Sequence, residues 1–308
     1  MPIPIVLDTD IGTDIDDAYA LVLAAASPEV DLKAVTTVCG DTLLRARIAR
    51  RLLDLLGRRD VPVAPGAAQP LTPGVRRGWM VHEGQGIDLS EVDEAALRAG
   101  PAVPELVGSL VAATQPCGEP LWLVSIGALT NIAWCLEKMP AGSTGRIGGI
   151  VSMASCFAGF GPEATQGEHN VACDPQALAR VLQSGIPVAL VGLNVTRKTR
   201  MDAEDAARLE SLGTPLAAAL AGMHRVWFRA IGRDASPMHD PLAVAALFRP
   251  DLLEWTEVCA EVADSADGIV IYNPPRAGQV STCRIAAAVH ADAFHALFFH
   301  RIERAARG

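Results

Sequence analysis

Short apolar runs alternate with helix-forming stretches along the chain. The first of them are a β-branched run at residues 3–7, an alanine-rich stretch at 18–26 and a second β-branched run at 32–38. Short apolar runs bounded by loops are typical of buried strands, whereas a longer alanine-rich stretch favours a helix. The N-terminal region therefore predicts a strand, a loop, a helix and a second strand.

The same alternation returns further along the chain. We expect strands at 121–126, 147–153 and 187–193, and helices at 130–136 and 175–183. Strands that alternate with helices favour an α/β fold, a mainly parallel sheet flanked by helices. Because ligands of such sheets bind beyond the carboxyl ends of the strands, the residues after each apolar run are the candidates for function.

The composition is that of a globular protein with a large core. Of the 308 residues, 50% are hydrophobic and 20% are charged. A disordered chain would contain fewer apolar residues and more charge. Since no linker-like run interrupts the sequence, we expect one domain over residues 1–308.

Charge and hydropathy argue against nucleic-acid and membrane partners. Phosphate contacts need clustered Lys and Arg, whereas this chain has a net charge of -9 and three lysines. The apolar run at 18–26 is about half of the ~20 residues that a membrane span needs, and the N-terminus lacks a signal-like pattern. Seven cysteines without a C-x-x-C pair predict reduced, mostly buried thiols, so we expect a cytoplasmic protein.

Five aspartates fall within ten residues directly after the first predicted strand. The segment reads D-T-D-I-G-T-D-I-D-D, from Asp8 to Asp17. Carboxylates this close repel one another, and a hard divalent cation would remove the repulsion because carboxylate oxygens are its preferred ligands. Capping of the following helix by Asp16 or Asp17 would account for only one or two of the five.

The spacing excludes an EF-hand, which needs Gly sixth and Glu twelfth where a count from Asp8 reaches Thr13 and Tyr19. Two enzyme families place an acidic loop after the first strand. Haloacid-dehalogenase-like phosphatases begin a D-x-D motif with an attacking aspartate, which fits Asp8. Those enzymes also need a later lysine and a second acidic pair; Lys138 and Lys198 are poorly placed, and a second Asp-Asp pair is absent.

The acidic segment more fully resembles the D-T-D-x-G-x-D-D-A signature of the inosine-uridine-preferring nucleoside hydrolases. It carries two extra residues, with D-T-D-I-G at 8–12 and D-D-A at 16–18. Further matches follow in order: T-T-V-C-G at 36–40, V-H at 81–82, G-A-L-T-N-I-A at 127–133, E-H-N at 168–170, D-P at 174–175 and H-D-P-L-A-V at 239–244. The resemblance implies a Rossmann-like fold with its active site at the C-terminal ends of the strands.

This resemblance also implies a reaction, the Ca²⁺-dependent hydrolysis of ribonucleosides to free nucleobase and ribose. The ion would be held by the side chains of Asp10, Asp17 and Asp240 and by the backbone carbonyl of Ile126. Asp10 would take a proton from the metal-bound water, and His239 would protonate or hydrogen-bond the departing base.

Substrate-binding residues follow from the same resemblance. Asp16 and Asn170 would bind the ribose hydroxyls, and Glu168 would lie near the 5′ end of the sugar. Further substrate contacts are expected from Asp41, from His82 in a glycine-rich loop, from Met153, and from Trp227, which either stacks on the base or packs in the core.

The chain departs from the family pattern at several positions. Asp14 is an extra carboxylate, which we interpret as lying behind the metal ligands. Asp41 and Pro162 stand where the family has asparagines. The charged stretch at 197–210 is interpreted as a solvated helix together with the residues that lead into it.

Several alternatives stay open from the sequence. The base contacts fall in variable loops, so the resemblance does not choose between purine and pyrimidine nucleosides. A protein that binds a ribosyl compound without turnover, and a haloacid-dehalogenase-like phosphatase, are the competing functions. The family resemblance further implies a homodimer or homotetramer with a role in nucleoside salvage.

Overall fold

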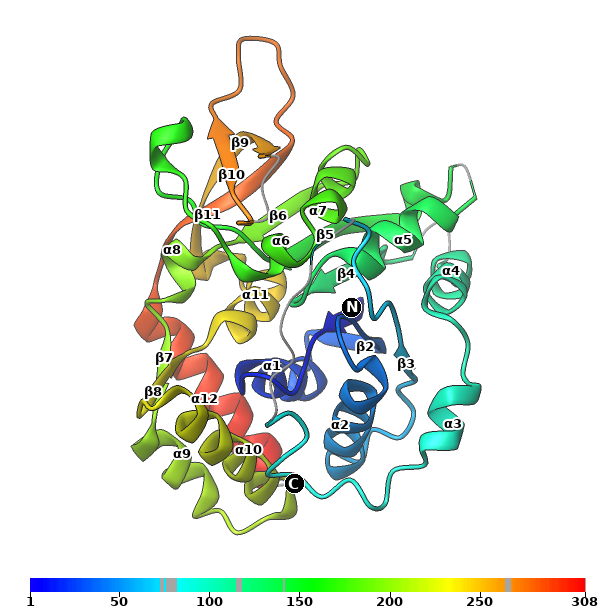
Figure 1. The fold of residues 1–308 in the computed structure, drawn as a ribbon, viewed down its shortest axis with the longest axis vertical. Coiled ribbons are helices and arrows are strands. Elements are labelled where there is room, and N and C mark those ends of the chain that lie inside the picture. Colours follow the sequence, from blue (N-terminus) through cyan, green and yellow to red (C-terminus); the bar gives the residue numbers. More distant parts are fainter. Residues whose placement is uncertain (73–74, 76–81, 115–117, 141, 264–266, 308) are drawn as a thin grey trace.

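A nine-stranded sheet forms the centre of the computed structural model of the chain (Figure 1). The structure describes residues 1–72, 75, 82–114, 118–140, 142–263 and 267–307. Across the sheet the strands follow the order β10-β9-β11-β6-β5-β4-β1-β2-β3. Their bounds are β1 Ile3–Thr9, β2 Val30–Thr37, β3 Val63–Pro65, β4 Leu121–Ser125, β5 Ile147–Met153, β6 Val188–Val191, β9 Leu253–Val262, β10 Val270–Asn273 and β11 Cys283–Val289.

Parallel pairing dominates this sheet. Strands β1 to β6 and β11 pair in parallel, and β9 runs antiparallel to both β10 and β11. Strand β1 has β2 on one side and β4 on the other. Successive strands are therefore added in one direction across the sheet from β1 to β3 and in the opposite direction from β4 onward. A reversal of this kind opens a crevice at the carboxyl ends of the two strands, where α/β proteins bind their ligands.

Helices cover both faces of the sheet and enclose two hydrophobic cores. One core lies beneath α1 Asp16–Ala26, α2 Thr42–Leu55, α10 Pro215–Ile231, α11 His239–Phe248 and α12 Ala291–Arg307. The other lies beneath α4 Val103–Ala113, α5 Thr130–Lys138 and α7 Pro175–Leu182. The remaining elements are α3 Glu94–Ala99, α6 His169–Cys173, α8 Leu193–Thr196, α9 Ala203–Glu210, the pair β7 Arg200–Asp202 and β8 Ala235–Pro237, and the short helices η1 Ser143–Arg146, η2 Pro162–Ala164 and η3 Pro250–Leu252.

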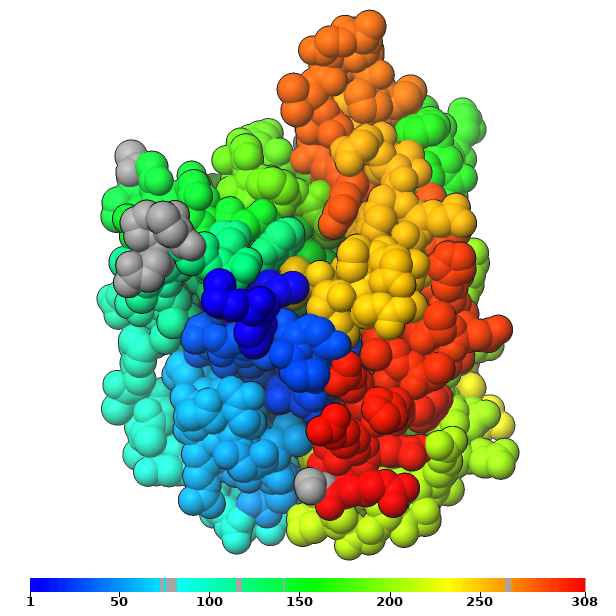
Figure 2. Space-filling model, turned by 180° about the vertical axis from the view of Figure 1, so that it is seen from behind, coloured from blue at the N-terminus to red at the C-terminus, as the bar shows by residue number. Residues whose placement is uncertain are grey.

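Helix α1 is apolar on every side and is buried from Asp16 to Ala24. A helix of this composition needs neighbours all round, and α2, α11 and α12 supply them. Figure 2 shows the C-terminal segment, in red, directly against the N-terminal third of the chain, in blue. Because α1 is enclosed in this way, the acidic loop that precedes it is held in the middle of the molecule.

The structure confirms the predicted strand and helix order and changes some boundaries. Strand β1 extends to Thr9, so Asp8 lies within a strand and not in the loop after it. Strand β6 ends at Val191, because Gly192 turns the chain and α8 begins at Leu193. The charged stretch at 197–210 contains β7 as well as α9, and Met201 in β7 is fully buried.

Helix lengths and cysteine burial complete the description of the fold. No helix formed by the described residues is long and apolar enough to cross a membrane. Cys135, Cys156 and Cys283 are buried and form no disulfide, whereas Cys39 and Cys259 are partly exposed.

Asp174 ties together three segments on one side of the sheet. Its buried carboxylate accepts hydrogen bonds from the backbone amides of Leu71 (2.7 Å) and Thr72 (3.1 Å) and from the hydroxyl of Thr130 (2.7 Å), and it caps α7. We predict that Asp174→Ala lowers the free energy of unfolding by about 3 kcal/mol, because it leaves these donors unsatisfied.

Urea denaturation would measure this loss. The matched control is Asp251→Ala, which removes a carboxylate whose ion pair lies at the surface and should change the stability by less than about 1 kcal/mol. Equal losses in the two variants would contradict the role assigned to Asp174.

Candidate active site

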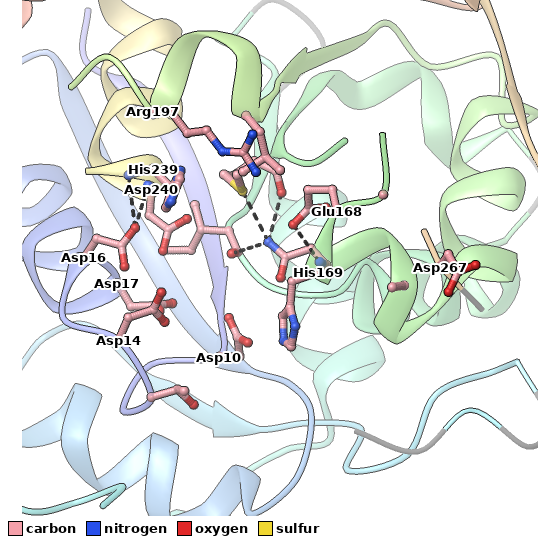
Figure 3. Close-up of a pocket in the computed structure, with 17 residues that line it drawn as sticks. Asp10, Asp14, Asp16, Asp17, Glu168, His169, Arg197, His239, Asp240 and Asp267 are labelled. Atoms are coloured by element: carbon pink, nitrogen blue, oxygen red, sulfur yellow. Dashed lines mark hydrogen bonds between the residues drawn. The ribbon is translucent and has the colours of Figure 1, made fainter. Parts of the chain in front are cut away.

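A cavity of about 490 Å³ opens at the carboxyl ends of β1, β4 and β5, at the reversal of the sheet (Figure 3). This volume is typical of small-molecule sites. Most of the polar side chains that line it come from the loop after β1, from α6 and from the first turn of α11. The lining residues are Asp10, Thr13, Asp14, Asp16, Asp17, Ile126, Met153, Gly167, Glu168, His169, Asn170, Ala172, Leu193, Arg197, His239, Asp240 and Asp267.

Thr9 shapes the acidic loop between β1 and α1. Its hydroxyl donates to the carboxylate of Asp17 and accepts from the amide of Ile11 at 3.0 Å. Helix α1 has Ile15 at its N-cap position, without a capping side chain. Neither Asp16 nor Asp17 therefore occupies the N-cap position of α1, and both carboxylates have partners elsewhere.

Asp16 joins the two ends of the site across more than two hundred residues of sequence. Its Oδ2 accepts hydrogen bonds from the backbone amides of His239 (3.0 Å) and Asp240 (3.3 Å), the first residues of α11. The N-terminus of a helix favours a negative charge, so Asp16 caps α11 in place of α1. This contact brings the D-D-A and H-D-P segments into one cavity, as Figure 3 shows.

Burial and mutual repulsion disfavour the charged form of several aspartates in this cavity. Burial, followed by the repulsion of neighbouring carboxylates, raises the pKa of Asp16, Asp17 and Asp240 well above the ordinary value. Burial and the charge of Asp10 raise the pKa of Asp14 in the same way. The groups of the protein thus offset the negative charge of these carboxylates only in part.

The donor set fits a hard divalent cation. Asp14, Asp16 and Asp17 each offer a carboxylate oxygen, and these atoms lie within 4.8 Å of one another. Oδ1 of Asp16 is buried without a hydrogen-bond partner. A cation would relieve both the repulsion and the missing contact. Asp14, which we expected behind the ligands, lines the cavity itself.

Asn170 ties together the ends of two neighbouring strands. Its Nδ2 donates to the backbone carbonyls of Ile126 (2.9 Å), directly after β4, and Met153 (3.0 Å), at the end of β5. All three residues line the cavity. The amide of Asn170 therefore fixes the orientation of the Ile126 carbonyl.

The carboxylate of Glu168 is held almost entirely by backbone amides. It accepts from Asn170 at 2.7 Å and from Ser155 and Val171 at 3.0 Å each, and so caps α6. Burial raises its pKa, and these hydrogen bonds act in the opposite direction. Glu168 therefore holds the wall of the cavity in addition to lining it.

His239 is oriented by a single hydroxyl. Thr196, at the end of α8, lies 2.6 Å from its Nδ1. Burial first, and then the charge of Arg197, lower the pKa of His239 to about 4, so the ring is neutral near pH 7. With Nδ1 engaged, Nε2 is the ring nitrogen left for a ligand.

Three of the expected substrate residues lie outside the lining of the cavity. Asp41 is exposed and caps α2 through the amide of Leu44. His82 Nε2 contacts the carbonyl of Thr13 at 2.6 Å, and its ring lies 5.8 Å from that of Trp227. His82 thus contacts the acidic loop directly, and Trp227 lies beside His82. Val81, the other residue of the V-H match, is outside the described residues.

The structure gives the phosphatase hypothesis no nucleophile. Asp8 is fully buried in β1 and is absent from the cavity lining. Its Oδ1 accepts from the hydroxyl of Thr36 at 2.6 Å and from the side-chain Nδ2 of Asn131 at 2.7 Å. A carboxylate enclosed by the sheet in this manner cannot attack a bound phosphate.

Known proteins with related sequences identify the family. The model of the inosine-uridine preferring nucleoside hydrolases matches residues 5–296. A curated relative, the pyrimidine-specific ribonucleoside hydrolase RihA of Escherichia coli O7:K1, is 35% identical over 274 residues, which cover 83% of each chain. This chain belongs to the inosine-uridine preferring nucleoside hydrolase family.

Solved structures agree with the fold of this hydrolase. A purine-preferring ribonucleoside hydrolase from Gardnerella vaginalis superimposes with a TM-score of 0.83 at 27% identity, covering 99% of both chains. A plant nucleoside hydrolase superimposes with a TM-score of 0.84 at 25% identity, covering 98% of this chain and 99% of the other. The family and the α/β fold expected from the sequence motifs are confirmed, and the protein is an enzyme of this hydrolase class.

Sequence reasoning missed three charged or titratable residues that line the cavity of the hydrolase. His169 stands inside the E-H-N match, between two residues that were singled out. Arg197 directly follows α8; it is exposed, as expected for the stretch 197–210, and it also lines the cavity. No sequence motif marks Asp267. It reaches the site through a backbone contact between Gly268 and Glu168, which are distant in sequence.

The segment at 82–88 braces the acidic loop from outside. Glu83 accepts a hydrogen bond from Thr13 and forms a buried ion pair with Arg45 at 3.1 Å. The segment itself lies against α10, where the backbones of Gly86 and Gly222 meet. A Cβ atom added at Gly222 would stand 2.1 Å from the carbonyl oxygen of Gly86.

We predict that Gly222→Ala destabilises the hydrolase by about 2 kcal/mol, because the new methyl group pushes segment 82–88 away from α10. Urea denaturation and hydrogen exchange of residues 82–88 would measure both effects. Gly108→Ala, in a helix with open space around it, is the matched control and should be neutral or stabilising. Unchanged exchange in the Gly222 variant would disprove the bracing role.

Proposed function

We propose that this hydrolase cleaves the N-glycosidic bond of ribonucleosides with Ca²⁺ in the acidic cavity and with Asp10 as the general base. The observation that carries the proposal is the pair of hydrogen bonds from the amides of His239 and Asp240 to Asp16. They join a cluster of carboxylates and an oriented imidazole in one small-molecule cavity. Family membership supplies the reaction class, the hydrolysis of ribonucleosides.

The residues that would hold the cation are Asp10, Asp17 and Asp240, through their carboxylates, and Ile126, through its carbonyl. Bound there, Ca²⁺ would neutralise the carboxylates, bind the ribose hydroxyls and polarise the attacking water. Asn170 keeps the carbonyl of Ile126 in place. The raised pKa values of Asp17 and Asp240 support a cation at this position, because a bound cation would favour their charged forms.

At the sugar, the chain supplies negative charge and orientation. Asp16, Asn170 and Glu168 would bind the ribose, and each is held by hydrogen bonds to the backbone. Positive charge develops on the ribosyl ring as the bond to the base breaks, and fixed carboxylates stabilise it without having to reorganise. Asp10 would accept the proton of the attacking water.

At the base, His239 would act through Nε2, because Thr196 engages Nδ1. The low pKa of its ring favours a hydrogen bond to the base over proton donation near pH 7. We also infer that the chain works as one domain in a homodimer or homotetramer, in the cytoplasm, in nucleoside salvage. The family resemblance supports the oligomeric state and the role in salvage, and the sequence composition supports the single domain and the cytoplasmic location.

We predict that the purified protein releases ribose from ribonucleosides when Ca²⁺ is present, and that Asp10→Asn lowers kcat roughly 1,000-fold, because a general base contributes on this order. A reducing-sugar assay measures the product. Asp251→Asn, an exposed carboxylate variant, is the control and should keep full activity. Tight binding of nucleosides without ribose release would favour the alternative of a ribosyl-binding protein.

Calcium binding gives a separate prediction. Calorimetric titration of chelator-treated protein should detect Ca²⁺, and Asp17→Asn should weaken the affinity by more than about 100-fold, with a smaller effect of about 10-fold for Asp14→Asn. Calcium at 100 times its Kd should also stabilise the wild type by about 2.7 kcal/mol. Wild-type affinity in Asp17→Asn would refute the proposed ligand set.

A further inference from the structure

Arg197 is a solitary cation in a cavity of carboxylates. Seven aspartates and glutamates line the described cavity, and Arg197 is the one lysine or arginine among the lining residues. Side chains of opposite charge form ion pairs where their charged atoms approach within about 4 Å. Several other arginines of the described residues form such pairs, as Arg45 does with Glu83.

The guanidinium of Arg197 is instead available to a ligand. No carboxylate of the described residues forms an ion pair with it. Its hydrogen bond to the side-chain oxygen of Gln166 is long, at 3.3 Å, and leaves further N–H groups unused. The side chain is also exposed to the cavity mouth.

The backbone holds Arg197 at the His239 end of the cavity. Arg197 follows Thr196, the residue that orients His239, and its amide donates to the carbonyl of Leu193 in the last turn of α8. Its charge acts on the imidazole of His239. Figure 3 shows the guanidinium reaching into the cavity between His239 and Glu168, opposite Asp14 and Asp17.

We propose that Arg197 is a catalytic residue that donates hydrogen bonds to the departing nucleobase and stabilises its negative charge. This inference rests on the proposed function, which puts the ribose at the aspartates and the base at the His239 end. When the C1′–N bond breaks, its electron pair moves onto the base, and the oxygen of the water forms the new bond to C1′. The proton lost by the water finally restores the neutral base, so the step needs no other reactant.

The chemistry of a guanidinium narrows the class of substrate. Arginine only donates hydrogen bonds, so it favours a base that carries an exocyclic oxygen beside the glycosidic nitrogen, onto which the charge can spread. A uracil-like base has such an oxygen, and an adenine-like base does not. A phosphate dianion would also attract Arg197, but the surrounding carboxylates would repel it more strongly than they repel a base whose charge appears only in the transition state.

The experiment compares Arg197→Gln with Lys198→Gln in the calcium-loaded enzyme. Lys198 is the adjacent residue, is exposed and is outside the cavity lining, so its variant loses the same charge at nearly the same place. The substrates are uridine, whose base is a poor leaving group, and para-nitrophenyl riboside, whose nitrophenolate leaves without assistance. Thermal melts establish that both variants are folded.

We expect Arg197→Gln to lower kcat for uridine by roughly 10- to 100-fold and kcat for the nitrophenyl riboside by less than about threefold. Arg197→Lys should recover part of the loss, and Lys198→Gln should resemble the wild type on both substrates. The selective loss on uridine is the signature of leaving-group stabilisation, which a merely structural role would not produce.

Other outcomes would overturn the inference. Equal losses on both substrates would mean that Arg197 supports the site and not the leaving group, and no loss would mean that it has no part in the reaction. With uridine 5′-phosphate as a third substrate, a loss confined to that compound would show that Arg197 recognises a phosphate. If the wild type hydrolysed neither riboside, the proposed function itself would fail, which is distinct from a failure in the variant alone.

Discussion

The hydrogen bonds between Asp16 and the first turn of α11 are the contact on which the rest of the site depends. They join a residue at the start of α1 to amides 223 and 224 positions later in the chain. The carboxylate satisfies two donors that a helix N-terminus leaves open, and the helix in turn favours the negative charge. Asp240 and His239 therefore reach the cavity with their backbone already fixed by the acidic loop.

This arrangement buries negative charge at one end of an otherwise apolar helix. Asp16 and Asp17 are buried at the start of a helix that is apolar on all sides, and burial raises the pKa of both. The enclosure of α1 by α2, α11 and α12 offsets this cost through buried apolar surface. The stability that these helices supply thus permits a destabilising cluster of buried aspartates at one end of the sheet. Active sites commonly lower the stability of a protein in this way.

Much of the fold and of the site was predictable, because both follow from local patterns. Alternating apolar runs predicted the parallel sheet, and the aspartates of the first loop predicted the acidic end of the cavity. The errors occurred where tertiary contacts override the local pattern. Asp8 lies in the sheet because Thr36 and Asn131 hold it there, and Met201 in the charged stretch is buried within β7.

The sequence by itself determined the family, the order of strands and helices, and the residue types that carry the chemistry, since these depend on neighbours in the chain. Only the tertiary structure decided which side chains share the cavity. Asp14, His169 and Arg197 line it, whereas Asp41 and Trp227 do not. The physical reason is that a cavity at the reversal of a parallel sheet is built from loops distant in sequence, whose side chains acquire their neighbours, and their electrostatic environment, only when the sheet and its helices pack together.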